Sequence, residues 1–321
     1  MKNLLFIGPR FYNYHVYIKN GFEKAGYHVD YFDDRPSTSF LSKALLRLNK
    51  NLIKKQIRKY FDSILLETSK KHYDVVFVLY GQSFSKEMME EMRSKMNDTR
   101  FIFYMYDPIF SMPDRLEFAK VFDKCYSFDS DDCKKYPIFH FLPLFYSNEI
   151  KKQELVYDSS YVGTIMPGKY AYINNMLTQL KSHYDNIYEL KVIQSPLVWL
   201  YYKLTKKEFR KSKMKEFTYS RISNQEADEI MAKSRFILDC PKKNQSGLTI
   251  RCFEALEANK KLITTNQAIK EYDFYNPNNI YIFEDKFDFE DAFFKNEYQE
   301  VPVEIKEKYS LDNWIKQILE K

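Results

Sequence analysis

The residues best suited to chemistry lie in one stretch of the second half of the chain. It reads Ser246-Gly247-Leu248-Thr249-Ile250-Arg251-Cys252-Phe253-Glu254-Ala255-Leu256, followed by Lys260-Lys261-Leu262-Ile263-Thr264-Thr265-Asn266. The pattern predicts a loop, a helix over 248–258 and a strand over 261–265. At about 100° per residue, Gly247, Arg251 and Glu254 fall on one narrow arc of that helix.

This arc suits a nucleotide diphosphate. The N–H groups and dipole at a helix N-terminus attract a phosphate, and Gly247 allows close approach to the backbone. Arg251 can donate a forked pair of hydrogen bonds to a diphosphate, and Glu254 can accept from two neighbouring ribose hydroxyls. An ordinary ion pair between Arg251 and Glu254 is the competing interpretation. The sequence leaves both interpretations open.

Two titratable residues of the first half are candidates for a catalytic base. His15 opens the first predicted helix, and Asp107 follows the predicted strand 101–106. The carboxyl ends of parallel strands meet at one edge of a sheet, so the two residues can be close in space. A helix N-terminus disfavours imidazolium and keeps His15 neutral, while Asp107 could orient its other ring nitrogen. The competing interpretation makes His15 a turn residue and Asp107 a cap before Pro108.

The sequence predicts neither a metal site nor a disulfide framework. Asp129-Ser130-Asp131 has the spacing of a metal-binding D-x-D motif, but Asp132-Cys133-Lys134-Lys135 follows, which is typical of a helix start with an acidic first turn. The four cysteines form no C-x-x-C pair. Neither a dinucleotide fingerprint nor a phosphate-binding P-loop motif occurs.

Short apolar runs alternate with helical patterns along both halves of the chain. Strands are predicted at 3–7, 28–32, 75–80, 101–106, 124–128, 138–142, 160–163, 189–193, 217–221, 236–239, 261–265 and 280–283. Helices are predicted at 14–25, 42–69, 86–96, 170–183, 224–233, 248–258 and 311–320. This alternation predicts an α/β protein of two Rossmann-like, doubly wound parallel sheets that face a cleft. Four of the seven glycines lie near predicted strand ends: Gly8, Gly81, Gly163 and Gly247.

A length of 321 residues favours two domains. A polar stretch at 147–158 predicts the boundary, giving domains at 1–150 and 151–310 and a final helix at 311–321 that packs back on the first domain. The N-terminal apolar run is too short for a signal peptide, and no later run could span a membrane. We therefore expect a cytoplasmic protein.

The 246–266 segment resembles the donor-binding segment of GT-B glycosyltransferases, especially the bacterial CgeB-like group and the group 1-like enzymes. Ser160-Tyr161-Val162-Gly163-Thr164 is similar to the first strand of their C-terminal domain, and Phe122–Asp129 and Phe141–Tyr146 are similar to the end of their N-terminal domain. The chain lacks the first glutamate of the E-x(7)-E pair of many retaining members. Inversion or retention therefore stays open.

The resemblance implies a metal-independent transfer of a sugar from a nucleotide-diphosphate donor to a glycan or lipid-linked acceptor, with no cofactor, in surface polysaccharide biosynthesis. The base would be His15 or Asp107. The implied donor site comprises Gly163, Thr164, Lys242, Ser246, Gly247, Leu248, Thr249, Arg251 and Glu254. The implied acceptor side comprises Gly8, Tyr80 and Gly81.

Two stretches, 43–59 and 203–215, carry seven Lys or Arg residues each. Basic amphipathic helices can lie on the anionic inner face of a membrane, although a solvated face over a normal core is the more common explanation. The net charge of +6 is too small to predict nucleic-acid binding. A non-catalytic two-domain protein that senses a nucleotide sugar is one alternative to an enzyme. A nucleic-acid-binding protein that uses the two basic stretches is a second, and it predicts a steep loss of affinity with salt.

Overall fold

The computed structural model describes residues 2–10, 13–37, 50–220 and 222–320. They divide into two compact units. The first comprises Met1–Pro143 and Leu311–Lys321, and the second comprises Leu144–Ser310. The sequence places the boundary near residue 150, whereas the chain passes from one unit to the other after Pro143. Among the described residues, no helix is long and apolar enough to cross a membrane.

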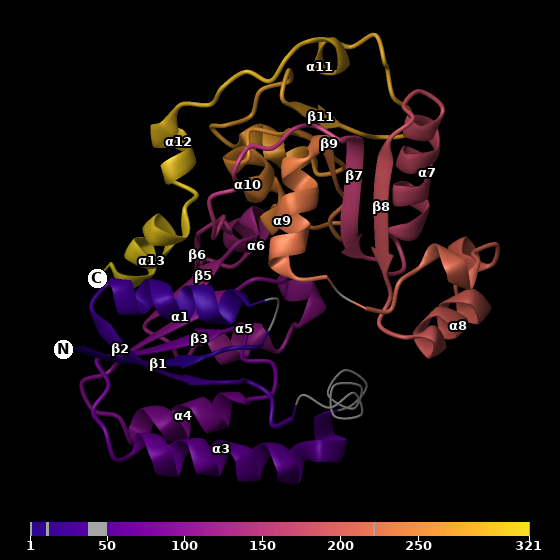
Figure 1. The fold of residues 1–321 in the computed structure, drawn as a ribbon. Helices are drawn as coiled ribbons and strands as arrows, with labels where there is room; N and C mark the ends of the chain where they lie inside the picture. Colours follow the sequence, from indigo (N-terminus) through magenta and orange to yellow (C-terminus); the bar gives the residue numbers. More distant parts are fainter. Residues whose placement is uncertain (1, 11–12, 38–49, 221, 321) are drawn as a thin grey trace. The chain divides into compact units, whose positions relative to one another are not determined.

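Unit 1 is built on a six-stranded parallel sheet with the order β2-β1-β3-β4-β5-β6. Its strands are β1 (Lys2–Ile7), β2 (Tyr27–Phe32), β3 (Val75–Leu79), β4 (Arg100–Met105), β5 (Lys124–Ser127) and β6 (Phe139–Phe141). Its helices are α1 (Tyr14–Lys24), α3 (Lys54–Thr68), α4 (Lys86–Ser94), α5 (Arg115–Ala119) and α6 (Ser130–Lys135). Figure 1 shows α1 on one side of this sheet and α3 and α4 on the other. Both faces are thus covered, which explains why β3 is apolar throughout.

The last helix of the chain, α13 (Leu311–Leu319), belongs to unit 1. The Trp314 side chain is buried and contacts the rings of Phe77 and Tyr104, with centroid distances of 5.8 and 4.9 Å. Gly21 of α1 leaves space for Ile315, because a Cβ on Gly21 would lie 2.9 Å from the Ile315 side chain. Through these contacts, the C-terminal helix packs against α1 and the sheet of unit 1.

Unit 2 is built on a five-stranded sheet with the order β11-β10-β9-β7-β8. Its strands are β7 (Tyr157–Thr164), β8 (Ile187–Val192), β9 (Ser234–Asp239), β10 (Lys261–Thr264) and β11 (Ile280–Ile282), and every pair is parallel. Its helices are α7 (Tyr170–Lys181), α8 (Pro196–Thr205), α9 (Asn224–Ala232), α10 (Ile250–Glu257), α11 (Ala292–Lys295) and α12 (Val303–Glu307). Successive β9 residues alternate between two buried clusters, because Phe236 and Leu238 join one and Ile237 joins the other. The two parallel α/β sheets confirm the predicted fold class.

Three predicted elements differ from the structure. No strand covers the described part of 217–221, where Thr218 makes only an isolated bridge to Val192 of β8. The predicted helix 42–69 lies partly outside the described residues, which contain a 3₁₀ turn at Lys50–Ile53 followed by α3. The basic stretch 203–215 is not one helix, because α8 ends at Thr205 and two 3₁₀ turns follow it. The Trp199 indole of α8 donates to the Ser212 hydroxyl and thereby ties α8 to the chain that follows it.

Candidate functional site

In unit 2, the loop after β9 lies at the point where the strand order reverses. Strands β7 and β9 are neighbours, and their connections leave the sheet in opposite directions. Ligands of doubly wound sheets bind outside the carboxyl ends of the strands at this point. Gly163 and Thr164 end β7, and Asp239 ends β9. The loop 240–249 therefore starts beside the predicted Gly163–Thr164 corner and leads into α10.

Asp239 fixes the N-terminus of α10. Its side chain is buried and accepts hydrogen bonds from the hydroxyls of Thr249 and Thr264, at 2.7 and 3.0 Å. The Cys252 thiol lies 3.6 Å from the same carboxyl group, and burial raises the pKa of this thiol well above its usual value. Thr249 is the N-cap of α10, so the bond ties the first turn of the helix to the ends of β9 and β10.

Asn266 fixes the loop before the helix. Its buried side-chain amide donates to the carbonyl oxygens of Ser246 and Gly247, at 3.1 and 3.3 Å. The Gln245 side chain donates to the same Gly247 carbonyl at 2.7 Å. Asn244 has a positive φ of 63°, which turns the chain back toward the helix. The helix mouth is therefore ordered by side chains from the loop and from beyond β10.

Arg251 and Glu254 form an ion pair with 2.9 Å between Nη1 and Oε2. This is the contact of the competing interpretation. Arg251 lies in the first turn of α10 and Glu254 at the start of the second, on a helix whose mouth faces the switch point. Glu254 is buried, with 8% of its surface exposed. A third charged group is near: burial, together with the negative charge of Glu254, raises the pKa of Asp228 to about 6, while a bond from Asn148 opposes this shift.

The other expected donor residues differ in their roles. A Cβ on Gly163 would lie 2.8 Å from the Tyr161 hydroxyl, so local packing by itself favours a glycine there. Leu248 is buried in the core and offers its backbone, not its side chain, to the mouth. Ser246 is almost fully buried. The carbonyl of Lys242 accepts from the Gln245 N–H and closes the turn that leads to the mouth.

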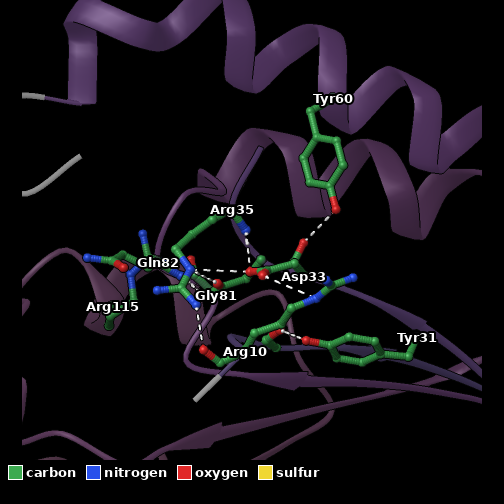
Figure 2. A network of polar contacts seen from close by, with 10 residues as sticks. Arg10, Tyr31, Asp33, Arg35, Tyr60, Gly81, Gln82 and Arg115 are labelled. Atoms are coloured by element: carbon green, nitrogen blue, oxygen red, sulfur yellow. Dashed lines mark hydrogen bonds and ion pairs between the residues drawn. The ribbon is translucent and has the colours of Figure 1, made fainter. Parts of the chain in front are cut away.

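In unit 1, polar side chains gather at the carboxyl ends of β1, β2 and β3 (Figure 2). Asp33 follows β2 and lies at the centre of the group: its Oδ1 accepts from the backbone N–H and the Nε of Arg35, at 3.1 and 3.2 Å. Arg10 Nε lies 3.7 Å from the other carboxyl oxygen. Tyr60 of α3 donates to the Asp33 carbonyl at 2.9 Å, and Tyr31 donates to the Gly8 carbonyl at 2.8 Å.

Asp34 is a fully buried carboxyl group in the same cluster. It accepts from the Gln82 backbone N–H at 2.8 Å and lies 3.5 Å from Arg35 Nε. Burial raises the pKa of Asp34, while the bond from Gln82 and the charge of Arg35 oppose the shift. The bond to Gln82 joins the end of β2 to the loop after β3.

That loop contains the expected acceptor-side residues Tyr80 and Gly81. Both have positive φ angles, 69° and 61°, so the chain leaves β3 by a left-handed turn. Arg115, which is buried, donates to the carbonyls of Gly81 and Phe84 and braces this turn. The Tyr80 hydroxyl donates to Asp107 Oδ2 at 3.2 Å. The turn therefore links three of the predicted residues, Tyr80, Gly81 and Asp107.

His15 lies against Tyr31, with ring centroids 5.2 Å apart. Burial and the neighbouring Arg10 lower its pKa, while Asp33 raises it. Among the described residues, its buried Nδ1 has no hydrogen-bond partner. The nearby carboxylate that influences His15 is therefore that of Asp33, and no bond from Asp107 orients Nδ1. His15 is held in its neutral form, as a base requires.

The sequence reasoning missed Asp33, Asp34 and Arg35. They follow a predicted strand directly, and Asp107 was selected for that same reason, so the signal was present in the sequence. The local pattern predicts a strand that ends at Asp239, but not the anchoring roles of Asp239 and Asn266. These residues bond to partners far along the chain, which no local pattern identifies.

The D-x-D motif has a structural role. Asp129 is the N-cap of α6 and accepts from the Asp132 N–H at 3.1 Å, as predicted for a helix start. Asp132 in turn accepts from the Ile109 N–H at 2.7 Å. Within the described parts of the chain, no group of three or more His, Cys, Asp or Glu residues is placed to hold a metal ion.

Comparisons with known proteins bear on the fold. No protein-family model matches the chain, and no curated protein matches its sequence. Solved structures match nearly all of it. Sucrose-phosphate synthase from Thermosynechococcus elongatus has a TM-score of 0.62 at 11% identity, with 99% of this chain and 94% of that one covered.

Two further solved structures also match nearly the whole chain. Anabaena Alr3699/HepE, solved with UDP and glucose, has a TM-score of 0.63 at 9% identity and coverages of 99% and 98%. The catalytic domain of starch synthase IV from Arabidopsis thaliana, bound to ADP and acarbose, has a TM-score of 0.61 at 7% identity and coverages of 98% and 95%. Two Rossmann-like units on parallel sheets, together with these matches, show that the chain has the GT-B glycosyltransferase fold.

Proposed function

We propose that the protein is a glycosyltransferase that moves a sugar from a nucleotide-diphosphate donor to a hydroxyl of a glycan or lipid-linked acceptor, in surface polysaccharide biosynthesis. The observation that carries the proposal is the mouth of α10. It opens at the β7/β9 switch point of unit 2, and Arg251 and Glu254 follow it along the helix. GT-B relatives solved with UDP and glucose or with ADP support a nucleotide-sugar ligand.

The donor half of the proposal assigns the diphosphate to the 246–249 mouth. Its N–H groups, Arg251 and the lysines Lys242 and Lys243 would stabilise the negative charge of the leaving nucleotide diphosphate. Glu254 would accept from the ribose hydroxyls, exchanging part of its ion pair with Arg251 for bonds to the ligand. Because cationic side chains and a helix N-terminus supply the charge stabilisation, the transfer would need no metal ion.

The acceptor half assigns the hydroxyl to the carboxyl end of the unit 1 sheet, near Gly8, Tyr80 and Gly81. His15 or Asp107 would remove the proton of that hydroxyl as its oxygen bonds to the anomeric carbon and the nucleotide leaves. His15 fits a base because its lowered pKa keeps it neutral at pH 7. Asp107 fits a positioning role as well, because it bonds to Tyr80.

A binding experiment tests the donor half. The wild type and Glu254→Gln would be screened by thermal shift against UDP-, GDP-, TDP- and CMP-sugars, and nucleotide release would be followed. Glu257→Gln is the matched control, because it changes the same residue type one turn further along α10. We expect one nucleotide class to stabilise the wild type and Glu257→Gln but not Glu254→Gln, with slow nucleotide release that EDTA does not reduce.

Other outcomes separate the alternatives. Stabilisation without nucleotide release in the presence of any acceptor would support a nucleotide-sugar sensor. If Glu254→Gln lowers the melting temperature of the free protein but responds to donors as the wild type does, the ion pair is purely structural. No stabilisation by any donor would overturn the proposal.

A further inference from the structure

Helix α8 of unit 2 carries apolar side chains on its exposed face. Leu197, Leu200, Tyr201 and Leu204 are 72%, 45%, 57% and 73% exposed. The spacing of these four residues places them within an arc of about 100° on the helix surface. Trp199, on the opposite side, is buried. A contiguous apolar stripe on a helix surface is typical of an interaction site.

The buried side of α8 holds this stripe in a fixed orientation. The Trp199 indole donates to Ser212 Oγ at 3.0 Å, and that hydroxyl donates to the Phe209 carbonyl at 2.7 Å. The ring of Tyr202 lies 5.1 Å from that of Phe209, which stacks on Tyr170 of α7 at 4.5 Å. The buried side of α8 is therefore fixed against the rest of unit 2, and these contacts hold the leucines on the outer side of the helix.

The segment after α8 adds positive charge next to the stripe. Its exposed basic residues are Lys207, Arg210, Lys211, Lys213 and Lys215. The two acids nearest to these basic residues, Glu208 and Glu216, are both engaged in hydrogen bonds. Glu208 accepts from the backbone N–H groups of Gly168 and Ala171, at 2.7 and 3.1 Å. Glu216 accepts from the Tyr170 hydroxyl at 2.5 Å and from the Lys213 N–H at 2.6 Å.

We propose that α8 and the basic segment 206–215 form a docking surface for an anionic lipid bilayer. The leucines and Tyr201 would enter the boundary between headgroups and acyl chains, and the lysines and Arg210 would lie among anionic headgroups. This inference goes beyond sugar transfer and does not depend on the donor site.

Charge and side-chain type favour a bilayer over other partners. A nucleic acid would meet the lysines and could stack a base on Tyr201, but it offers no apolar surface for the three exposed leucines. A second copy of the chain would bring two strongly basic segments together, which like-charge repulsion disfavours. A bilayer matches both the apolar stripe and the charge.

The other basic stretch has a different arrangement in its described part. Ile53, Ile57 and Phe61 point into the core of unit 1. Arg58 pairs with Asp62 and Glu91 on the outside, at 2.6 Å in both cases. Here the buried apolar side faces the core and Arg58 is neutralised by two carboxylates, which is typical of an ordinary solvated helix. The two basic stretches thus differ, and the proposal applies to α8.

Vesicle flotation tests the proposal on the full-length protein. We expect binding to vesicles of mixed phosphatidylcholine and phosphatidylglycerol, weakened by salt, and little binding to phosphatidylcholine alone. The double variant Leu197→Gln/Leu204→Gln should bind at least about tenfold more weakly. The pair Lys207→Gln/Lys211→Gln should lose about 30-fold, since each basic residue near an anionic surface contributes a factor of about five.

Matched variants control for general effects. Leu66→Gln replaces a leucine of α3 that is 67% exposed, and Lys151→Gln/Lys152→Gln replaces two exposed lysines of unit 2 outside the docking surface. Both should bind vesicles as the wild type does, and all variants should melt within a few degrees of it, because the replaced side chains are exposed.

Three results would overturn the proposal. The first is equal weakening by the control variants. The second is retention on single-stranded DNA with no flotation. The third is a dimer in light scattering that Leu197→Gln/Leu204→Gln dissociates, again with no flotation.

Discussion

Replacing Asp239 by asparagine tests how the mouth of α10 is held. The carboxyl group accepts from Thr249 and Thr264 while only 6% exposed. Asparagine keeps the shape but has one acceptor oxygen, so one threonine hydroxyl can no longer donate to this side chain and the other bond loses its charge. Loss of a bond to a charged group costs about 1.5–3 kcal/mol, and the loss of charge assistance in the other bond costs up to about 1 kcal/mol more.

We therefore expect Asp239→Asn to lower the free energy of unfolding of unit 2 by about 2 kcal/mol. For a unit of this size, this corresponds to a fall in melting temperature of about 4–8 °C. Differential scanning calorimetry measures it. Because Thr249 is the N-cap of α10, the same variant should bind a nucleotide-sugar donor about tenfold more weakly in isothermal titration.

Asp273→Asn is the control for the effect on binding. Asp273 also accepts two side-chain bonds, from Tyr309 and Lys308, but lies outside the mouth loop. The Asp273→Asn variant should change the affinity for the donor less than twofold. An unchanged melting temperature in Asp239→Asn would refute the reasoning about the buried bonds. A lower melting temperature with full donor affinity would show that Asp239 stabilises the sheet without positioning the donor.

Three further predictions concern unit 1. Gly21→Ala should destabilise the protein by about 1–3 kcal/mol in urea unfolding, although alanine favours a helix, because its Cβ would lie 2.9 Å from Ile315. Gly21→Ala should cost less in the Ile315→Ala background than in the wild type, and an equal cost in both backgrounds would contradict the packing argument. Asp132→Asn should raise the melting temperature at pH 8 but not at pH 4, because burial raises the pKa of Asp132 to about 6. An acid with a raised pKa is stabilising in its protonated form and loses that advantage as pH rises through its folded-state value, so an equal effect at both pH values would contradict the assignment. Arg10→Gln should move the acid limb of a pH–rate profile to higher pH, because Arg10 lowers the pKa of His15; a downward or absent shift would exclude His15 as the base.

The sequence predicts the alternation of strands and helices well because the signal is local. Both faces of each central strand are buried, so the strands are nearly continuous apolar runs, as in Val75–Leu79. The helix α10 was found within two residues of its observed start because Gly247, Thr249 and the apolar spacing are contiguous. The missing strand at 217–221 shows the limit of a local pattern, because pairing depends on the neighbouring strand edge, and Thr218 makes only a bridge to β8.

By itself, the sequence determined the fold class, the segment that makes the mouth of α10 and the positions of His15, Tyr80 and Asp107 at the ends of elements. Only the tertiary structure decided which side chains near these positions form hydrogen bonds with one another. Asp34 bonds to Gln82, Arg115 to Gly81 and Asp239 to Thr264 across tens of residues of chain. It also decided that the leucines of α8 face outward, because a helical period locates an apolar stripe but not the side on which the rest of the protein packs.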